Sequence, residues 1–445
     1  MEVPAQFQND MTDTASTALQ PWSSVFTDPY LQALIDTALL NNQELNILTR
    51  EIQMEQNEVM ARSGEYLPFV KVQAGMGADK VGAFTRNGAV EENLEIVEGE
   101  EFPKVLGDFV IGANVTWEVD IWKKLRNAKK SAFLRYLAST EGRNLATTNL
   151  VAEIAMSYYE LMALDSQLKN VEQNISILNN ALEIVRAQKE AAQTTELGVR
   201  RFEAEVLKNR SARYYILQKI TETENRINFL TGRFPQAVPR DTSDFLDLPV
   251  QNMSAGVPSQ LLQNRPDIRR AELVLEATKV DVEVARAEFF PSLDISAGVG
   301  YQAFNPKYLL NTPESILFSL VGDIAAPIVN RKAITATFNT ANARQVQAVY
   351  EYEQTLLKAY EEVANQIAKM ENLQQSFNLK EDQVDALTEA VEFSNDLFRS
   401  ARADYFEVLQ TQREALEAQL ELIEIKAEQI GVSVTIYQAL GGGWR

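Results

Sequence analysis

The chain contains one order of segments twice. Residues Glu65–Gly77 are matched without gaps by Glu288–Gly300, at an offset of 223 positions, and the match extends back to Leu39 opposite Leu262. Each copy then continues with a second alternating segment and a very long helical stretch. A period of about 210–220 residues is far longer than the roughly 20–50 residues of a solenoid repeat. We therefore interpret each copy as a duplicated, domain-sized unit.

Each copy has two segments in which apolar and polar residues alternate, and this period of two predicts β-strands with one apolar face. In the first copy the clearest example has apolar residues at every second position: Phe109, Ile111, Ala113, Val115, Trp117, Val119 and Ile121. In the second copy the apolar positions are Leu293, Ile295, Ala297, Val299 and Tyr301, then Ile316, Phe318 and Leu320. We expect strands at about 66–77, 108–122, 291–301 and 315–326, with polar loops between the strands of each pair, over roughly 78–104 and 302–314.

The third kind of segment is helical and unusually long. From Ile328 to Ile430 the chain has neither Gly nor Pro, and in both copies apolar residues step by alternating four and three positions, as in coiled coils. These residues are Leu164, Leu168, Val171, Ile175, Leu178, Leu182 and Val185, then Leu416, Leu420, Ile423, Ala427, Ile430, Val434 and Tyr437. A helix of about 65 residues would be about 100 Å long. We therefore expect each stretch to break once into two antiparallel helices, near Ala191–Gly198 and near Ser400–Tyr405.

These segments divide the chain into three parts. The first structural repeat is expected over 1–233, from an N-terminal segment through the first two strands and the first long helices. A proline-punctuated connector with little periodicity follows over 234–257. The second repeat is expected over 258–445. We expect helices at about Asp28–Ser63, 123–230, Pro258–Ala287 and 331–440.

Composition excludes several classes of function. Asp and Glu outnumber Lys and Arg by 62 to 42, whereas nucleic-acid-binding proteins present a basic surface. The chain has no Cys and no His, which removes the usual nucleophile–base pairs and most zinc or copper sites. We therefore predict that the protein is not an enzyme and uses no cofactor or metal. No apolar stretch of about 18 residues or more indicates a transmembrane helix, and no signal peptide follows Met1.

Four amphipathic strands of spanning length suggest an outer-membrane barrel. A transmembrane strand needs about 9–11 residues, and bacterial barrels have at least about eight strands. Four strands alone would leave two open edges in lipid, where unpaired backbone groups are not tolerated. The chain would therefore share a barrel with copies of itself. A soluble β-sandwich beside a helical bundle is the alternative interpretation.

A basic run at the end of the second strand favours the membrane interpretation. Aromatic residues next to cations are typical of a membrane–water interface, although such a run also suits a solvated helix face. The residues are Trp117 and Trp122, followed by Lys123, Lys124, Arg126, Lys129 and Lys130.

Three groups of residues resemble the TolC-type outer-membrane efflux protein family. They are Leu262–Glu272 followed by Ala285–Pro291, Trp22–Leu31 with Ala38–Asn42, and Phe398–Gln412. The resemblance covers essentially the whole chain. It is nearer to the OprM/CusC-like branch, the outer-membrane components of resistance-nodulation-division pumps.

The resemblance implies a fold that is mainly α with a membrane β-barrel. Three copies would share one twelve-stranded barrel, four strands from each chain, continued by a long periplasmic α-helical coiled-coil tunnel with a closable tip. The homotrimer would lie in the lipid of the bacterial outer membrane with its helices in the periplasm. The natural protein is expected to be lipid-anchored through a Cys outside this sequence. An inner-membrane resistance-nodulation-division transporter and a periplasmic adaptor would deliver small toxic compounds, such as drugs or metal ions, to this passive exit duct.

The resemblance also implies a gate at the second-half tip, within Ser400–Gln412. Asp404 and Glu407 are three positions apart and share one face of a helix, so three copies would form rings of carboxylates that attract cations. These rings would pair with Arg402 or Arg399. Gln410 stands where the family often has an acidic residue, and Ala401 replaces a frequent Gly at the turn. In the alternative interpretation, Asp404 only caps a helix and Glu407 is a solvated surface residue.

Two further groups of residues follow from the resemblance. The first-half tip carries Glu196, Arg200 and Arg201, which would pair with the acidic rings or contact the adaptor. The family signature residues, Arg265, Pro266, Asp267 and Pro291, are expected to have structural roles, with Arg265 and Asp267 fixing a helix start and a buried polar contact. The scattered Met residues and the pair Tyr158 and Tyr159 are more consistent with packing than with a ligand site.

Two other functions also fit these sequence patterns. One is the exit duct of a type I protein-secretion system, and the other is a non-conducting coiled-coil scaffold or adaptor of the cell envelope. The duplicated strand pairs in the middle of each half favour a duct over an adaptor, which carries one hairpin flanked by a domain built from both termini. The cargo does not follow from the residues, because an exit duct accepts what its pump delivers.

Overall fold

The structure, a computed structural model, describes residues 17–241, 245–250, 256–329, 331–400, 402 and 404–444, apart from the side chains of Ala18 and Arg399. The chain forms two compact units. The helical unit comprises Met1–Ile52, Ala138–Glu272 and Glu351–Arg445, and the strand unit comprises Gln53–Leu137 and Leu273–Tyr350. Each unit takes segments from both halves of the sequence, so the predicted limits of the repeats near 233 and 258 stay a prediction.

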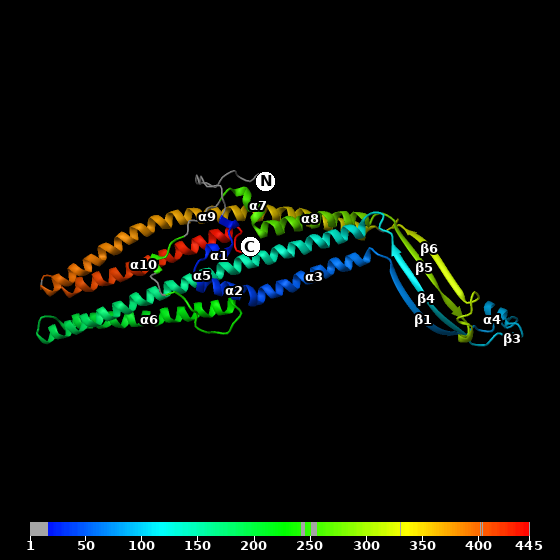
Figure 1. Cartoon of the computed structure of the whole chain (residues 1–445), viewed down its shortest axis with the longest axis horizontal. Helices are drawn as coiled ribbons and strands as arrows, with labels where there is room; N and C mark the ends of the chain where they lie inside the picture. Colours follow the sequence, from blue (N-terminus) through cyan, green and yellow to red (C-terminus); the bar gives the residue numbers. More distant parts are fainter. Residues whose placement is uncertain are drawn as a thin grey trace. The chain divides into compact units, whose positions relative to one another are not determined.

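The predicted fold class is confirmed: a helix, two long strands and a long helical hairpin follow one another twice (Figure 1). The first series is α3 (Gln43–Glu65), β1 (Phe69–Asp79), β4 (Leu106–Glu118), α5 (Lys124–Glu190) and α6 (Glu196–Leu230). The second is α8 (Pro266–Ala287), β5 (Ser292–Ala303), β6 (Ile316–Ala325), α9 (Lys332–Arg399) and α10 (Tyr405–Ala439). The shorter elements include α1 (Trp22–Val25), α2 (Pro29–Asn41), α4 (Arg86–Glu91), β2 (Glu95–Val97), β3 (Glu100–Glu101) and α7 (Leu261–Asn264).

The four long strands form one antiparallel sheet in the order β1-β4-β5-β6. Because directly opposed residues of antiparallel strands point to the same face, the register decides which side chains share a surface. One row across the sheet is Val72, Ala113, Val299 and Phe318. The neighbouring rows continue the pattern, so the alternating apolar residues of all four strands lie on one face of the sheet.

No described residue of the strand unit covers this apolar face. Val72 and Met76 of β1 are 81% and 83% exposed, and Phe318 and Leu320 of β6 are 83% and 76% exposed. The opposite face carries Gln73, Asn114, Ser296 and Ser319. The sheet therefore presents one apolar surface and one polar surface to its surroundings, and β1 and β6 form its two edges.

The two helices expected before the first strand of each half are each interrupted, so those predictions were wrong. The first breaks at Asn42, whose side chain donates to the Leu230 carbonyl oxygen over 2.9 Å and accepts from the Leu45 amide over 3.1 Å. It thereby ends α2 and caps α3. The second breaks at Arg265, and α8 then begins at Pro266 as the sequence predicts.

The predicted hairpins are confirmed. The first long stretch breaks between Glu190 and Glu196, and the second between Arg399 and Tyr405. The predicted coiled-coil seam residues are buried or half-buried, including Val171 and Leu178 in α5 and Ile423 and Tyr437 in α10. No helix among the described residues is long and apolar enough to span a membrane.

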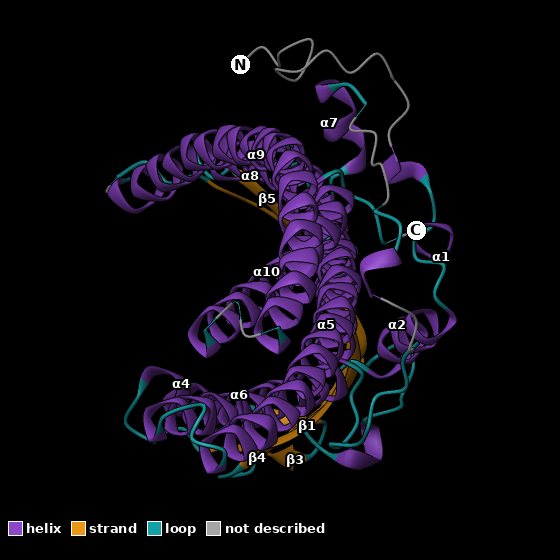
Figure 2. Cartoon of the chain, turned by 90° about the vertical axis from the view of Figure 1, so that its left-hand side faces the viewer, coloured by secondary structure: helices purple, strands orange, loops and turns teal. Residues whose placement is uncertain are grey.

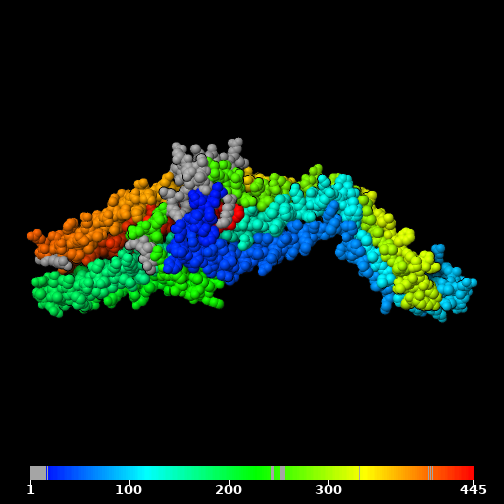
Figure 3. All heavy atoms as spheres, viewed as in Figure 1, coloured from blue at the N-terminus to red at the C-terminus, as the bar shows by residue number. Residues whose placement is uncertain are grey.

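The core of the helical unit joins the N-terminal segment to the long helices. Phe26, Leu31 and Ile35 are buried against Tyr158 of α5 and Tyr437 of α10, and Figure 2 shows α1 and α2 along one side of α5. The Tyr437 hydroxyl donates to the Gln20 carbonyl oxygen over 2.8 Å. In Figure 3 the blue N-terminal residues accordingly lie beside the red C-terminal ones.

Candidate functional site

The tips of the two helical hairpins meet in the helical unit. A small apolar core is formed by Leu178, Leu182 and Val185 of α5 with Val199, Phe202 and Val206 of α6. Three half-buried residues of the other hairpin pack against this core: Phe398, Tyr405 and Leu409. The first-half and second-half tips therefore belong to one site.

Two aromatic residues at the start of α10 make the contacts to α6. The Tyr405 ring packs on α6 at Gly198, where a Cβ atom would lie 3.4 Å from it, at van der Waals distance. The Arg201 guanidinium lies over the Phe406 ring, 5.1 Å from its centroid, a cation–π geometry. Neither Tyr405 nor Phe406 could be identified from the sequence as a contact residue, because their partners lie about 200 residues away in the chain.

The predicted gate residues surround this contact. Asp404 occupies the N-cap position of α10, and its side chain makes no capping hydrogen bond. Asp404, Glu407 and Arg402 are exposed, and Gln410 is half-buried and donates to Glu414. No ion pair joins Arg402 to Asp404 or Glu407 within the described part of one chain. Arg399 is the last residue of α9, and the structure does not describe its side chain; Ala401 lies outside the described residues.

The first-half tip residues are largely paired among themselves. Arg200 donates to Glu196 and Glu203 over 2.8 Å each, and Lys189 also pairs with Glu196. Lys189, and then Arg200, lower the pKa of the exposed Glu196 carboxyl below its usual range. Of the two predicted arginines, only Arg201 is directed to the second hairpin, where its partner is an aromatic ring and not a carboxylate.

The family signature residue Arg265 forms a buried junction of three helices. Its guanidinium, 8% exposed, bonds the Asp267 carboxylate over 3.0 and 2.7 Å, the Glu362 carboxylate of α9 over 2.8 Å and the Ala439 carbonyl oxygen at the end of α10 over 2.8 Å. Burial by itself would lower the pKa of Arg265, but Asp267 and Glu362 more than offset this and hold the pKa above its ordinary value. Pro266 occupies the first position of α8, where its missing N–H costs no helical hydrogen bond.

Pro291 marks the junction between α8 and β5 in the strand unit. Its carbonyl oxygen accepts the indole N–H of Trp122 over 2.8 Å. The Trp122 ring also stacks on Phe290, with ring centroids 4.6 Å apart. This contact joins the strand ends of the two sequence copies.

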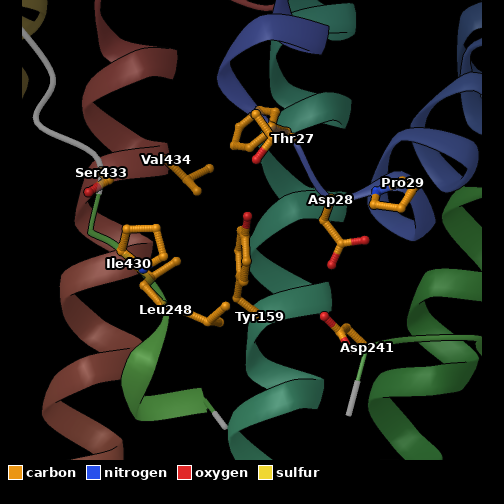
Figure 4. Close-up of a pocket in the computed structure, with 11 residues that line it drawn as sticks. Thr27, Asp28, Pro29, Tyr159, Asp241, Leu248, Ile430, Ser433 and Val434 are labelled. Atoms are coloured by element: carbon orange, nitrogen blue, oxygen red, sulfur yellow. The ribbon is translucent and has the colours of Figure 1, made fainter. Parts of the chain in front are cut away.

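A cavity of about 230 Å³ in the helical unit is a feature that sequence reasoning missed (Figure 4). Tyr159 lines it together with Asp28, Asp241 and Val434. Burial and the nearby Asp28 carboxylate raise the pKa of Tyr159 to about 12. No motif could indicate the cavity, because its lining comes from separate segments of the chain. The neighbouring Tyr158 is buried and donates to Asp28 over 2.6 Å, as expected for a packing residue.

The part of the chain that the structure describes contains no group of three or more His, Cys, Asp or Glu residues placed to hold a metal ion.

Comparison with known proteins places these features in one family. The family profile described as "Outer membrane efflux protein" matches residues 34–233 and 257–442. The chain is 26% identical over 443 residues to the pyoverdine export outer membrane protein OpmQ of Pseudomonas putida, covering 99% of this chain and 92% of that protein. It is 25% identical over 449 residues to the cation efflux system protein CusC of Escherichia coli O6:H1, covering 100% of this chain and 94% of that protein.

A solved structure has the same fold. The open state of the MtrE outer membrane channel of Neisseria gonorrhoeae superposes with a TM-score of 0.88 at 24% identity, covering 100% of this chain and 96% of that one.

Proposed function

This chain belongs to the outer membrane efflux protein family, and from this premise we propose that three copies of it form one closable exit duct. The family consists of outer-membrane channels of efflux systems and not of enzymes, so no catalytic site is required. The duct would be one twelve-stranded barrel, continued by a tunnel of the long helical hairpins. Its lumen would carry solutes passively out of the periplasm.

The observation that carries this proposal is the exposed apolar face of an open sheet. A sheet with one apolar face is stable in lipid only when its edge N–H and C=O groups are paired. β1 and β6 are both edges of a four-stranded sheet, and the barrels of bacterial outer membranes have at least about eight strands. Pairing β1 of one copy with β6 of the next satisfies both requirements, and three copies supply enough strands.

The proposed β1–β6 pairing is testable by disulfide formation, because the chain contains no Cys of its own. We expect Gln73→Cys to cross-link copies of the chain when combined with Ser319→Cys, Val321→Cys or Asp323→Cys, since a disulfide forms only where Cα atoms lie within about 7 Å. The measurement is non-reducing gel electrophoresis of the full chain, together with its mass by light scattering. The expected mass is three times the 50.0 kDa of one chain.

The matched control for the cross-linking is Gln73→Cys with Ser296→Cys. Ser296 lies on β5, an inner strand of the sheet, and should not reach β1 of any copy. Absence of cross-links for every β6 partner, or equal cross-linking of the β5 control, would contradict the shared barrel.

The cargo and partners follow from the family and its relatives. OpmQ is described as an exporter of pyoverdine and CusC as part of a cation efflux system. We infer that this duct likewise passes small compounds, drugs or metal ions that are toxic to the cell, delivered by an inner-membrane resistance-nodulation-division transporter through a periplasmic adaptor. The helical hairpins would lie in the periplasm, with a lipid anchor at the natural N-terminus. The repeats would have their limits near 233 and 258.

The gate in this proposal is the meeting point of the hairpin tips. Asp404 and Glu407 are exposed, and neither forms an ion pair with Arg402 within the described part of the chain. In a three-fold assembly their carboxylates could therefore contact Arg402 or Arg399 of a neighbouring copy. Gln410 adds no charge to these rings. Arg200, Arg201 and Glu196 form the flank of the tip that an adaptor would approach. Within each copy the Tyr405 and Phe406 contacts hold α10 against α6.

Loss of the Tyr405 contact should favour the open tip. Tyr405→Ala removes a ring that packs on the tip core of α5 and α6, and a truncated aromatic contact of this kind typically costs about 1 kcal/mol per copy. Three copies acting together would shift the open–closed ratio by about 100-fold. Single-channel recording should show a higher open fraction for Tyr405→Ala and no change for Tyr214→Ala, whose ring is 68% exposed on α6. An unchanged open fraction would show that the tip contact does not hold the gate.

A further inference from the structure

The start of α5 is a concentrated basic segment of the strand unit. Residues Lys123–Lys130 contain Lys123, Lys124, Arg126, Lys129 and Lys130 and no acidic residue, in a chain whose net charge is −20. The segment begins where β4 ends, at one end of the sheet (Figure 1). Its charge is thus opposite to that of the protein as a whole.

The nearby acidic residues do not neutralise this segment. Glu118 is paired with Lys124, and Asp120 is paired with Arg126 over 3.1 Å. Asp120 also accepts the backbone N–H groups of Leu125 and Arg126 over 3.1 and 3.0 Å, which fixes the start of α5. Lys123, Lys129 and Lys130 are exposed, and none of the three forms an ion pair with a described residue.

A chain of contacts links the basic segment to the apolar face of the sheet. Trp117 is one of the β4 residues on the apolar face, and its indole N–H donates to the Tyr66 carbonyl oxygen over 3.2 Å. The Tyr66 ring lies 5.7 Å from the Arg126 guanidinium carbon. Lys129 and Lys130 follow Arg126 by three and four residues on the helix and so continue the same face. The cations therefore begin where the apolar surface ends.

Exposed apolar side chains accompany the three free lysines. Trp122 is 46% exposed and Phe133 is 45% exposed. Phe133 follows Lys129 by four residues and Lys130 by three, so the three residues share one face of the helix. Lysine stems cover apolar surface while their charged ends reach toward the solvent or a headgroup. We call Trp122, Lys123, Lys129, Lys130 and Phe133 the collar patch.

We propose that the collar patch binds the phosphate headgroups of anionic phospholipids at the membrane surface. This inference rests on the proposed function, which places the apolar face of the sheet in lipid. Exposed Lys residues next to a membrane attract anionic lipids, and Trp side chains favour the headgroup level of the bilayer. With no acidic partner left for Lys123, Lys129 and Lys130 among the described residues, a lipid phosphate is the anion that this geometry accommodates. The patch would hold the duct at a fixed depth in the leaflet.

The test compares lipids retained by the full-length protein after purification from proteoliposomes. The vesicles contain phosphatidylethanolamine with phosphatidylglycerol as the minority component, and retained lipids are quantified by mass spectrometry. We expect the lipids retained by the wild type to be enriched in phosphatidylglycerol relative to the vesicles. In the triple variant Lys123→Gln, Lys129→Gln, Lys130→Gln this enrichment should be about tenfold lower, because three juxtamembrane cations are removed. High salt should weaken the wild-type enrichment, since it screens exposed charges.

The matched control removes the same charge elsewhere. Lys169→Gln, Lys279→Gln and Lys358→Gln change three exposed lysines outside the collar patch and should retain the wild-type enrichment. Equal enrichment in all three proteins would overturn the proposal, as would a similar loss in the control, because net charge and not the patch would then be responsible. Trp122→Ala, which leaves all charges in place, should reduce retention of both lipids.

Oligomeric mass and conductance are measured on the same samples. A trimeric, conducting wild type without phosphatidylglycerol enrichment overturns the lipid inference and leaves the duct standing. A monomeric, non-conducting wild type that still enriches phosphatidylglycerol supports the patch and overturns the duct.

Discussion

Replacing Asp404 and Glu407 together with alanine should raise the current through the duct at least about tenfold. Each exposed charge contact contributes about 0.5 kcal/mol, and two such contacts in each of three copies would hold the closed tip by about 3 kcal/mol. Loss of that energy would shift the open–closed ratio by about 100-fold. The variant should also lose preference for cations, because the proposed carboxylate rings that would attract them would be absent.

Single-channel recording in planar bilayers measures both effects. The wild type should show small, cation-preferring currents, and the double variant should show large currents with weaker selectivity. The matched control is Glu417→Ala with Glu424→Ala, which removes two exposed carboxylates from the same helix away from its tip. Substantial wild-type current that the tip variant leaves unchanged would keep the duct and place its gate elsewhere. Absence of current from inserted protein in both forms would contradict the acidic gate.

Replacing Arg265 with methionine should destabilise the helical unit by about 3 kcal/mol, the usual cost of leaving the partners of a buried ion pair uncompensated. The Asp267 carboxylate and the Ala439 carbonyl oxygen would lose their main donor, whereas Glu362, which is 53% exposed, would be solvated. The junction of α8, α9 and α10 should loosen as a result. Two measurements would detect the lower stability: a lower thermal unfolding midpoint, followed by the helical circular dichroism signal, and faster proteolysis between α7 and α8.

The control for Arg265 is Arg226→Met, which breaks an exposed ion pair with Glu153 over 3.0 Å and should change stability by less than about 1 kcal/mol. A double variant, Arg265→Met with Asp267→Asn, should be less destabilised than the two single changes add up to, because the charge left behind by Arg265→Met is removed. Additive effects in this comparison would show that the two residues do not act as a pair.

Much of the fold follows from periodicity. Alternation over about ten residues predicted the four long strands, and the four-three spacing from Leu164 to Val185 predicted the coiled-coil seam, since both depend only on which neighbours along one element share a face. The break at Asn42 was not predicted, whereas the helix start at Pro266 was. The Asn42 break depends on a distant partner, the Leu230 carbonyl oxygen. The Arg265 break has a local cause, because Pro266 favours extended backbone in the residue before it.

The candidate site divides in the same way. The charged residues of both tips, Asp404, Glu407 and Arg201 among them, came from motifs in the sequence. The rings that join the tips did not, because Tyr405 and Phe406 have no local pattern that marks them as contacts of Gly198 and Arg201.

The sequence by itself determined the elements and their duplicated order, because strand alternation, helical spacing and the punctuation by Gly and Pro are local properties of the chain. Only the tertiary structure decided that the apolar residues of β1, β4, β5 and β6 lie on one face, because a shift of the register by one residue would turn every side chain to the other side. It likewise decided that the two hairpin tips meet, since contacts between residues about 200 positions apart depend on how the long helices pack and leave no periodic trace in either partner.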